Sequence, residues 1–394
     1  MTLKTRTAGT SLRHAALGLG LLGLAIQPAF AEEAIRPAQT PTADFVAAAT
    51  RNSAVPGGYE VLSVPELGAV FAASVPDFTD GAAGDVYMLD ADTLAPIRRI
   101  QLKLRPFALA VDHQRGLLYA GNTKDGSLSV IDAKSGFFLR TIQLGKPGEG
   151  GKMEHTRMIE VDQATGRVFV TGPTNEGIVW IIDPGQSEPT HRIDNAVIWA
   201  AGLAYDGADR IYIGGGGAEE ILVLNAETGE KITTFSTGDT PPGQGSDSAH
   251  FMVNLSLDAK GGRLFAVDSH EGKLYVFNTA DGSIIAQVPI GPGALDVIWN
   301  PARDEAYVTY YGFNRAQPIG TGGIMVIDTK DYRIARDLGV KTFPSNLSLD
   351  VENQLLFASV SEPANDKHPD YAKGTIGSVV RLDLTKLAEL PQAE

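Results

Sequence analysis

Short apolar runs, each closed by an acidic or amide residue and a turn, recur along most of the chain. The first run of each repeat ends at Asp112, Asp162, Asp206, Asp258, Asn300 and Asp350. The second run begins at Val70, Leu118, Val168, Ile211, Leu264, Ala306 and Leu356. The third run ends at Asp90, Asp132, Asp183, Asn225, Asn278, Asp328 and Asp383. Runs of this length, rich in β-branched and aromatic residues and bounded by turn residues, predict strands.

The repeat has the length of one propeller blade. The string Asn-Leu-Ser-Leu-Asp occurs at 254–258 and again at 346–350, with a looser copy at 297–300 between them. Half the distance between the two strings is about the length of a four-stranded blade. No segment after residue 50 shows a helical period over three turns. We therefore predict an all-β fold, a seven-bladed β-propeller of four-stranded antiparallel blades, because such sheets bury both faces only when they close into a ring.

The last repeat lacks an outermost strand, since Asp383 leads into a polar tail. We expect residues between about Phe45 and Val55 to supply that strand and to close the ring, which would leave no open sheet edge. The predicted organisation is a leader at 1–31, a lead-in with the closing strand at 32–54, the propeller at 55–388 and a tail at 389–394.

The N-terminus has the three-part layout of a secretory signal peptide. Lys4, Arg6 and Arg13 precede an apolar run, which is followed by a small-residue triplet that ends at Ala31. We expect cleavage after Ala31 and a periplasmic protein with no membrane span left after cleavage. The string G-x-G-x-x-G at 18–23 lies inside this segment, so it does not indicate a dinucleotide site.

Composition narrows the range of functions. The chain has no Cys, which excludes disulfides, thiolate metal sites and a cysteine nucleophile. Its formal net charge is -14, and loss of the three basic residues of the leader would make it more negative still. A broad nucleic-acid-binding surface needs clustered Lys and Arg, so this charge permits at most a local basic patch. The 44 Gly are explained by the many tight turns that seven blades require.

Several strings resemble the bacterial YncE-like propeller family. They are Leu104-Arg-Pro-Phe107, His250-Phe251 leading into Asn254-Leu-Ser-Leu-Asp258, and the run from Asn300 to Thr309. Tyr307-Val308-Thr309 is also similar to the core of the YVTN propeller repeat, although Tyr310 stands where that repeat usually has Asn. The resemblance spans nearly the whole chain after the leader. It implies a periplasmic seven-bladed propeller without a settled catalytic activity, and it adds binding of single-stranded DNA as an alternative.

The long connections predict which face binds. By propeller topology, the loops that join one blade to the next and the loops between second and third strands emerge on one face. The five long connections all belong to these two kinds, and they are 76–84, 145–155, 238–250, 311–322 and 361–377. Insertions gathered on one face of a repeat protein usually mark its binding face. The alternative is that a surface tolerates long loops anywhere.

Residues at the start of the innermost strands would surround the channel mouth on this face. The predicted ligand-binding set is Arg105, Phe107, His155, Arg157, Trp199, His250, Phe251, Phe343 and Asn346. Arginine, histidine and aromatic side chains suit an anionic or aromatic ligand. The alternatives are that the aromatic residues plug the channel and that Arg105 only solvates an edge strand.

Catalytic and metal-binding signals are sparse. The nucleophile-elbow, zinc-protease and phosphate-loop motifs are absent, and most Asp residues occupy turn positions. We expect no cofactor and no metal, with His250, Asp268 and His270 as the candidate metal ligands if one binds.

The sequence thus predicts a monomeric, non-enzymatic exported propeller that binds a small molecule or a protein at the channel mouth. One alternative is nucleic-acid binding through a patch that includes Arg105 and Arg157. The other is an enzyme or metal-dependent protein whose site draws on several blades, such as His155, His250 and Asp268 brought within hydrogen-bond reach.

Overall fold

The computed structural model describes residues 41–53, 55–76, 82–241, 248–314, 320–363, 366–371, 373 and 377–391. The predicted signal peptide, with its cleavage site after Ala31, lies outside the described residues. Within the described residues, no helix has both the length and the apolar character needed to cross a membrane.

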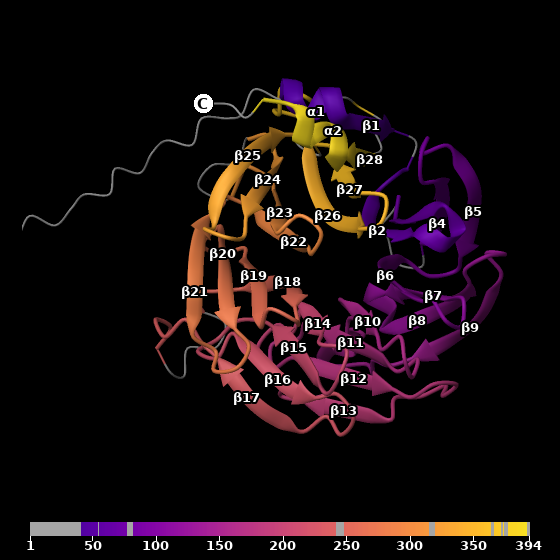
Figure 1. Cartoon of the computed structure of the whole chain (residues 1–394). Helices are drawn as coiled ribbons and strands as arrows, with labels where there is room; N and C mark the ends of the chain where they lie inside the picture. The colour runs from indigo at the N-terminus through magenta and orange to yellow at the C-terminus, as the bar shows by residue number, and fades with distance from the viewer. Residues whose placement is uncertain are drawn as a thin grey trace, which may run out of the picture. The chain divides into compact units, whose positions relative to one another are not determined.

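Seven four-stranded antiparallel sheets surround a central opening (Figure 1), as the repeats predict. The first three sheets, from inner to outer strand, consist of β2 (Gly58–Val64), β3 (Ala69–Ser74), β4 (Gly84–Asp90) and β5 (Pro96–Leu102); β6 (Pro106–Asp112), β7 (Leu117–Asn122), β8 (Ser127–Asp132) and β9 (Phe138–Gln143); and β10 (Ile159–Val161), β11 (Val168–Gly172), β12 (Ile178–Ile182) and β13 (His191–Asp194). The next three sheets consist of β14 (Leu203–Tyr205), β15 (Arg210–Gly214), β16 (Ile221–Asn225) and β17 (Lys231–Phe235); β18 (Met252–Asp258), β19 (Arg263–Asp268), β20 (Lys273–Asn278) and β21 (Ile284–Pro289); and β22 (Ala294–Asn300), β23 (Glu305–Tyr310), β24 (Gly323–Asp328) and β25 (Arg333–Gly339). The seventh sheet consists of β26 (Phe343–Asp350), β27 (Leu355–Ser361), β28 (Ser378–Asp383) and β1 (Ala49–Asn52). We number these sheets as blades 1 to 7.

The innermost strands contact one another all the way round. Each of β2, β6, β10, β14, β18, β22 and β26 packs against the next, and β26 packs against β2. The cores lie between neighbouring sheets, with fully buried aromatic residues such as Trp180, Phe265 and Phe357. Each sheet therefore buries both faces only because it has a neighbour on each side.

The recurrent Asp residues act as turn caps. Asp132 Oδ1 accepts the backbone N–H of Ser135 at 2.7 Å and the Ser135 hydroxyl at 2.6 Å. These hydrogen bonds lower the pKa of Asp132, because they favour the charged carboxylate. Asp90 caps its turn through Thr93 in the same way. The turn role predicted for these carboxylates is confirmed at both positions.

The N-terminal and C-terminal segments meet in blade 7. Strand β1 pairs antiparallel with β28, with Ala49 opposite Leu382 and Asn52 opposite Val379. The segment expected to supply this strand, from about Phe45 to Val55, does contain β1, although α1 (Ala43–Ala48) occupies its first residues. A second helix, α2 (Leu384–Glu389), follows β28 and begins at the side-chain cap of Asp383. Six-residue helices are too short to show a three-turn hydrophobic period, which is why the sequence pattern did not reveal them.

The two short helices share one hydrophobic core with blades 6 and 7. Phe45 of α1 is 4% exposed and belongs to the same cluster as Leu384 and Leu387 of α2. Arg336 of β25 forms an ion pair with Asp44 at 2.5 Å, which holds α1 against blade 6.

The substitution Phe45→Ala should therefore weaken the seam between the chain ends. We expect it to lower the free energy of unfolding by about 3–5 kcal/mol, because it removes a buried aromatic side chain. The neighbouring residue Val46 is 61% exposed, so Val46→Ala is a matched control with an expected effect of about 0.5 kcal/mol or less. Urea unfolding followed by circular dichroism measures both. Equal effects of the two substitutions would contradict the docking of α1.

Candidate functional site at the channel mouth

The inner strands carry an irregularity at the same place in five blades. The register between first and second strands shifts near Gly58, Pro106, Met252, Ala294 and Pro344. A β-bulge leaves a residue unpaired and redirects side chains, and bulges are common beside binding sites. The backbone N–H groups freed here point away from their own sheet and need partners elsewhere.

Side chains of the neighbouring blade supply those partners. Each of three polar residues lies four positions before the end of its inner strand and accepts a backbone N–H from the next blade. The pairs are Glu60 Oε2 with Leu109 N–H at 2.9 Å, Asp296 Oδ2 with Leu347 N–H at 2.7 Å, and Asn346 Oδ1 with Val61 N–H at 2.8 Å. The Asn346 amide also donates to Asp296 Oδ2 at 3.0 Å. These polar side chains thus connect blade to blade along the channel.

A cavity of about 290 Å³ lies at this end of the channel, and Glu60 and Asn346 are among the residues that line it. Three aromatic residues, Tyr59, Phe107 and Tyr311, contribute to its wall. The rings of Tyr59 and Phe107 are 4.5 Å apart between centroids. The guanidinium of Arg157 lies 4.6 Å from the centroid of Phe107, and its Nη1 is 3.6 Å from Glu60 Oε1. The cavity therefore combines flat apolar surfaces with one contact between an arginine and a carboxyl group.

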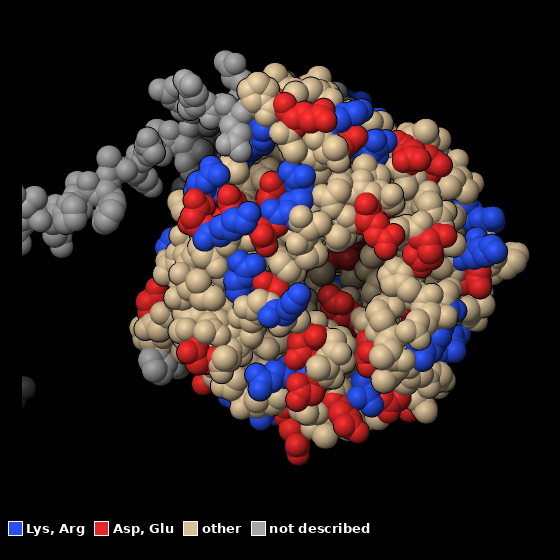
Figure 2. Space-filling view, in the orientation of Figure 1, with Lys and Arg blue, Asp and Glu red and all other residues tan. Residues whose placement is uncertain are grey.

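Below the mouth the channel is acidic. A second cavity of about 300 Å³ is lined by Glu160 and Asp296, and it shares Asn346 with the mouth cavity. Figure 2 shows acidic side chains inside the central opening, whereas acidic and basic side chains alternate over the surrounding face.

Burial alters the protonation of these carboxyl groups. Burial raises the pKa of Glu60 to about 8, although Arg157 and the Leu109 N–H act in the opposite direction. It raises the pKa of Glu160 to about 7. It also raises the pKa of Asp296 to about 6, against the hydrogen bonds from Leu347 and Val297. The channel can therefore take up protons near neutral pH.

The structure distributes the nine predicted site residues over three places. Phe107, Arg157 and Asn346 line the mouth cavity, and Phe343 lies beside it with its ring centroid 5.6 Å from that of Tyr311. The structure thus gathers four of the nine predicted residues at one cavity, and their role in ligand binding stays a prediction.

Arg105 and His155 form a second group at blades 2 and 3. Arg105 is 4% exposed, so it does not solvate an edge strand, and its Nη2 is 3.4 Å from Asp125. Burial lowers the pKa of His155, and the nearby positive charges of Lys124 and Arg105 lower it further. Neither residue is among those that line the mouth cavity.

Trp199, His250 and Phe251 form the third group at blades 4 and 5. The ring centroids of Trp199 and Phe251 are 5.6 Å apart. His250 is fully buried between two carboxylates, with Nδ1 2.6 Å from Asp268 and Nε2 2.5 Å from Asp239. Burial would lower the pKa of His250, but the hydrogen bonds to Asp268 and Asp239 outweigh burial and raise it to about 9.

The contact between His250 and Asp268 agrees with their expected approach. His270, the other candidate metal ligand, instead has Nδ1 3.3 Å from the carbonyl of Ser248 and its ring centroid 6.0 Å from that of Trp199. The structure thus unites two of the three candidate metal ligands. The contacts of His155 lie at blades 2 and 3, apart from this pair.

Sequence reasoning missed several residues of the mouth. Tyr59, Glu60 and Tyr311 line the cavity, and Asp296 lies directly below it. The sequence did contain a signal for Asp296. Asp296 lies four positions before the strand-ending Asn300, just as Asn346 lies four positions before the strand-ending Asp350. Blade 1 has Val64 in place of the strand-ending Asp, so Glu60 could not be aligned in this way.

The sheets, their order and the central channel define a seven-bladed β-propeller with a cavity at one channel mouth. The chain is similar to bacterial proteins named YncE. It is 28% identical over 309 residues to uncharacterized protein YncE of Salmonella typhi, an alignment that covers 78% of this chain and 83% of that protein. It is also 28% identical over 308 residues to uncharacterized protein YncE of Escherichia coli (strain K12), with the same coverage. No family model matches the chain.

The raised pKa of Glu60 predicts a pH-dependent stability. The unfolded chain loses the Glu60 proton near its ordinary pKa of 4.5, whereas the folded protein keeps it up to about pH 8. Stability therefore falls as pH rises through this window, and this contribution is constant above it. We expect Glu60→Gln to remove the loss and to be more stable than the native protein at pH 9, by on the order of 1–3 kcal/mol.

Urea unfolding at pH 5, 7 and 9 measures this difference. Glu352 is exposed on the turn after β26, and Glu352→Gln serves as the control. If Glu60→Gln and Glu352→Gln have the same pH profile, Glu60 does not carry a proton in the folded protein.

Proposed function

We propose that this YncE-like propeller is a non-enzymatic binding protein for a small organic molecule, which it holds at the channel mouth. The observation that carries the proposal is the cavity itself. It combines Tyr59, Phe107 and Tyr311 with hydrogen-bonding side chains such as Ser345 and Asn346. Largely apolar pockets with a few polar groups are typical of small-molecule sites.

The positions of the loops also favour this face of the propeller as the binding face. The cavity includes Tyr311, Ser361 and Gly57, which lie at the ends of the connections β23–β24, β27–β28 and β1–β2. These connections all emerge where the inner strands begin. A rigid ring with variable loops at one end is a common arrangement for binding.

The wall chemistry favours a ligand with a flat or cyclic part. Tyr59 and Phe107 offer ring faces, and aromatic rings stack with an energy of about 0.5–1.5 kcal/mol beyond the area that they bury. Arg157 lies 3.6 Å from the Glu60 carboxyl group, and Glu160 and Asp296 lie deeper in the channel. The cavity therefore suits a cyclic molecule whose polar groups can form hydrogen bonds with Arg157 or Asn346.

The nucleic-acid and enzyme alternatives gain no specific observation. Both arginines that the nucleic-acid alternative requires already contact a carboxyl group, since Arg105 lies 3.4 Å from Asp125 and Arg157 lies 3.6 Å from Glu60. The enzyme alternative requires His155 to join His250 and Asp268, but the contacts of His155 lie at blades 2 and 3. We also propose that the protein works in the periplasm, because of the signal-peptide pattern before Ala31.

A thermal-shift screen of the protein tests the binding function. Nucleosides, aromatic amino acids, cyclic sugars, amines and single-stranded oligonucleotides are the probes, because a ligand that binds only the native state raises the melting temperature. We expect a cyclic small molecule to bind and Phe107→Ala to weaken it about tenfold or more. Phe137 is 71% exposed in the same blade, so Phe137→Ala should leave affinity unchanged.

Two outcomes would contradict the proposal. One is a ligand whose affinity does not change in Phe107→Ala. The other is binding of oligonucleotides alone, with an affinity that falls steeply as salt increases, which would favour the nucleic-acid alternative.

Export has its own test. In a bacterium with a secretory pathway, the mature protein should start at Glu32 and should be released with the periplasmic fraction. N-terminal sequencing of that fraction measures the cleavage site. A protein that keeps Met1 and stays with the cytoplasmic fraction would rule out the signal peptide.

A further inference from the structure

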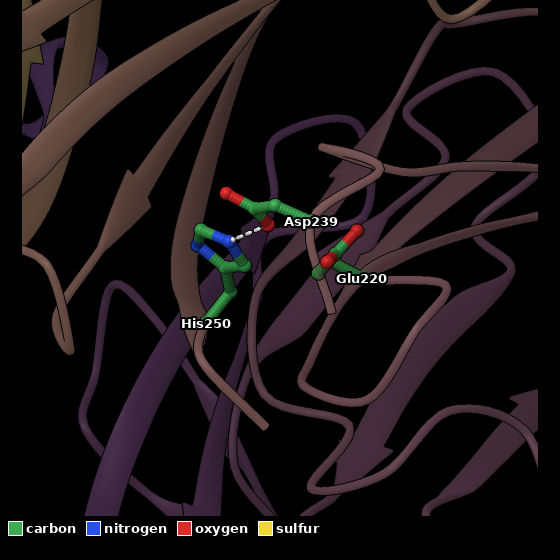
Figure 3. Close-up of side chains that lie close together, drawn as sticks. All are labelled: Glu220, Asp239 and His250. Atoms are coloured by element: carbon green, nitrogen blue, oxygen red, sulfur yellow. Dashed lines mark hydrogen bonds and ion pairs between the residues drawn. The ribbon is translucent and has the colours of Figure 1, made fainter. Parts of the chain in front are cut away.

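Three groups from blades 4 and 5 meet around one edge of the His250 imidazole (Figure 3). Glu220 directly precedes β16, Asp239 lies in the connection between β17 and β18, and His250 comes shortly before β18. One ligand atom from each of the three residues lies within 4.8 Å of the others. We propose that Glu220, Asp239 and His250 Nε2 bind a divalent first-row transition-metal ion such as Zn²⁺.

The far side of the imidazole is held as it is in metal-binding histidines. Its Nδ1 is 2.6 Å from Asp268 Oδ2, and a carboxylate on the second ring nitrogen orients such a histidine toward its metal. Asp268 is itself fully buried, and its Oδ1 accepts the backbone N–H groups of Phe251 and His270. Asp268 is therefore a positioning residue, and Nε2 is the nitrogen that faces the ligand atoms of Glu220 and Asp239.

The two carboxylates are positioned by a shared neighbour. The Thr237 hydroxyl is 2.9 Å from Glu220 Oε1 and 2.8 Å from Asp239 Oδ1. The Thr237 backbone N–H donates to Glu220 Oε2 at 3.0 Å. One threonine thus brings an oxygen of each carboxylate to the same place.

Charge and burial also favour a cation. Three carboxylates, those of Glu220, Asp239 and Asp268, surround one imidazole, and Glu220 is fully buried. Buried charges in proteins are normally paired or coordinate metals. Asp239 is 60% exposed, so solvent can reach the site and supply the remaining ligands. Thr240, next to Asp239, is buried, and its hydroxyl has no hydrogen-bond partner in the described part of the chain.

A second arrangement of ligands around His250 is less suitable. His250 Nδ1, Asp268 and Glu271 also lie close together. In that group the Glu271 carboxylate already contacts Lys273 at 2.6 Å and the Tyr275 hydroxyl at 2.8 Å. Asp268 is occupied by backbone N–H groups as described above. The Nε2 side has the solvent access that an entering ion needs.

The ligand types select the metal. One imidazole and two carboxylates, without a thiolate, suit Zn²⁺, Mn²⁺, Co²⁺ or Fe²⁺, whereas Ca²⁺ and Mg²⁺ prefer all-oxygen sites. This inference does not depend on the cavity at the channel mouth, because none of its residues lines that cavity.

Zn²⁺ titration of protein treated with a chelator and prepared without a histidine tag tests the proposal. We expect one Zn²⁺ per chain, a higher melting temperature with Zn²⁺, and no displacement by an excess of Mg²⁺. Glu220→Gln, Asp239→Asn and His250→Gln should each weaken Zn²⁺ at least about tenfold. Asp281 is exposed in a turn of blade 5, and Asp281→Asn should bind Zn²⁺ as the native protein does.

Asp268→Asn tests the positioning role. It should weaken Zn²⁺ about 10- to 100-fold and should change the visible absorption spectrum of bound Co²⁺, which a loss of stability alone would not do. Asp239→Asn alters a largely exposed side chain, so it should fold even if His250→Gln does not. The proposal is overturned if the native protein binds no stoichiometric Zn²⁺, or if folded Asp239→Asn binds Zn²⁺ with native affinity.

Discussion

The ring depends on satisfying backbone N–H groups that its own sheets leave unpaired. Where the inner strands bulge, the N–H groups of Val61, Leu109 and Leu347 are accepted by a side chain from the preceding blade. A buried donor without a partner costs about 1–3 kcal/mol, so the neighbouring blade must be in place at these three junctions. Hydrophobic packing joins the sheets, and these hydrogen bonds add polar contacts between blades along the channel.

This constraint explains why an acidic protein has carboxyl groups at its centre. Glu60 and Asp296 are hydrogen-bond acceptors between blades, and their raised pKa values follow from the burial that this role imposes. The same bulges turn Tyr59 and Phe107 toward the mouth cavity. The side chains that connect the blades, such as Glu60 and Asn346, therefore also line the mouth cavity. We expect substitutions of these residues to change stability and binding together.

The repeat made the fold predictable, whereas the site was predictable only in part. Strand ends such as Asp132 are determined by local turn chemistry, so seven copies could be counted without a structure. Phe107, Arg157 and Asn346 line one cavity, because Phe107 and Asn346 lie in the first half of an inner strand and Arg157 precedes one. That they bind a ligand stays a prediction. Glu60 was missed because blade 1 lacks the strand-ending Asp, and Asp239 was missed because its contact with His250 depends on the path of a long loop. Such contacts between distant parts of the chain have no local signature.

Strand β1 makes the last blade a joint product of both ends of the chain. Residue 49 pairs with residue 382, so blade 7 cannot be completed until nearly all of the protein has been synthesised. Contacts between residues so far apart in sequence form slowly, because a long loop must close first. Blades 1 to 6 each consist of consecutive strands and can form earlier. Completion of the seventh blade is therefore the folding step that closes the open array of sheets into a ring.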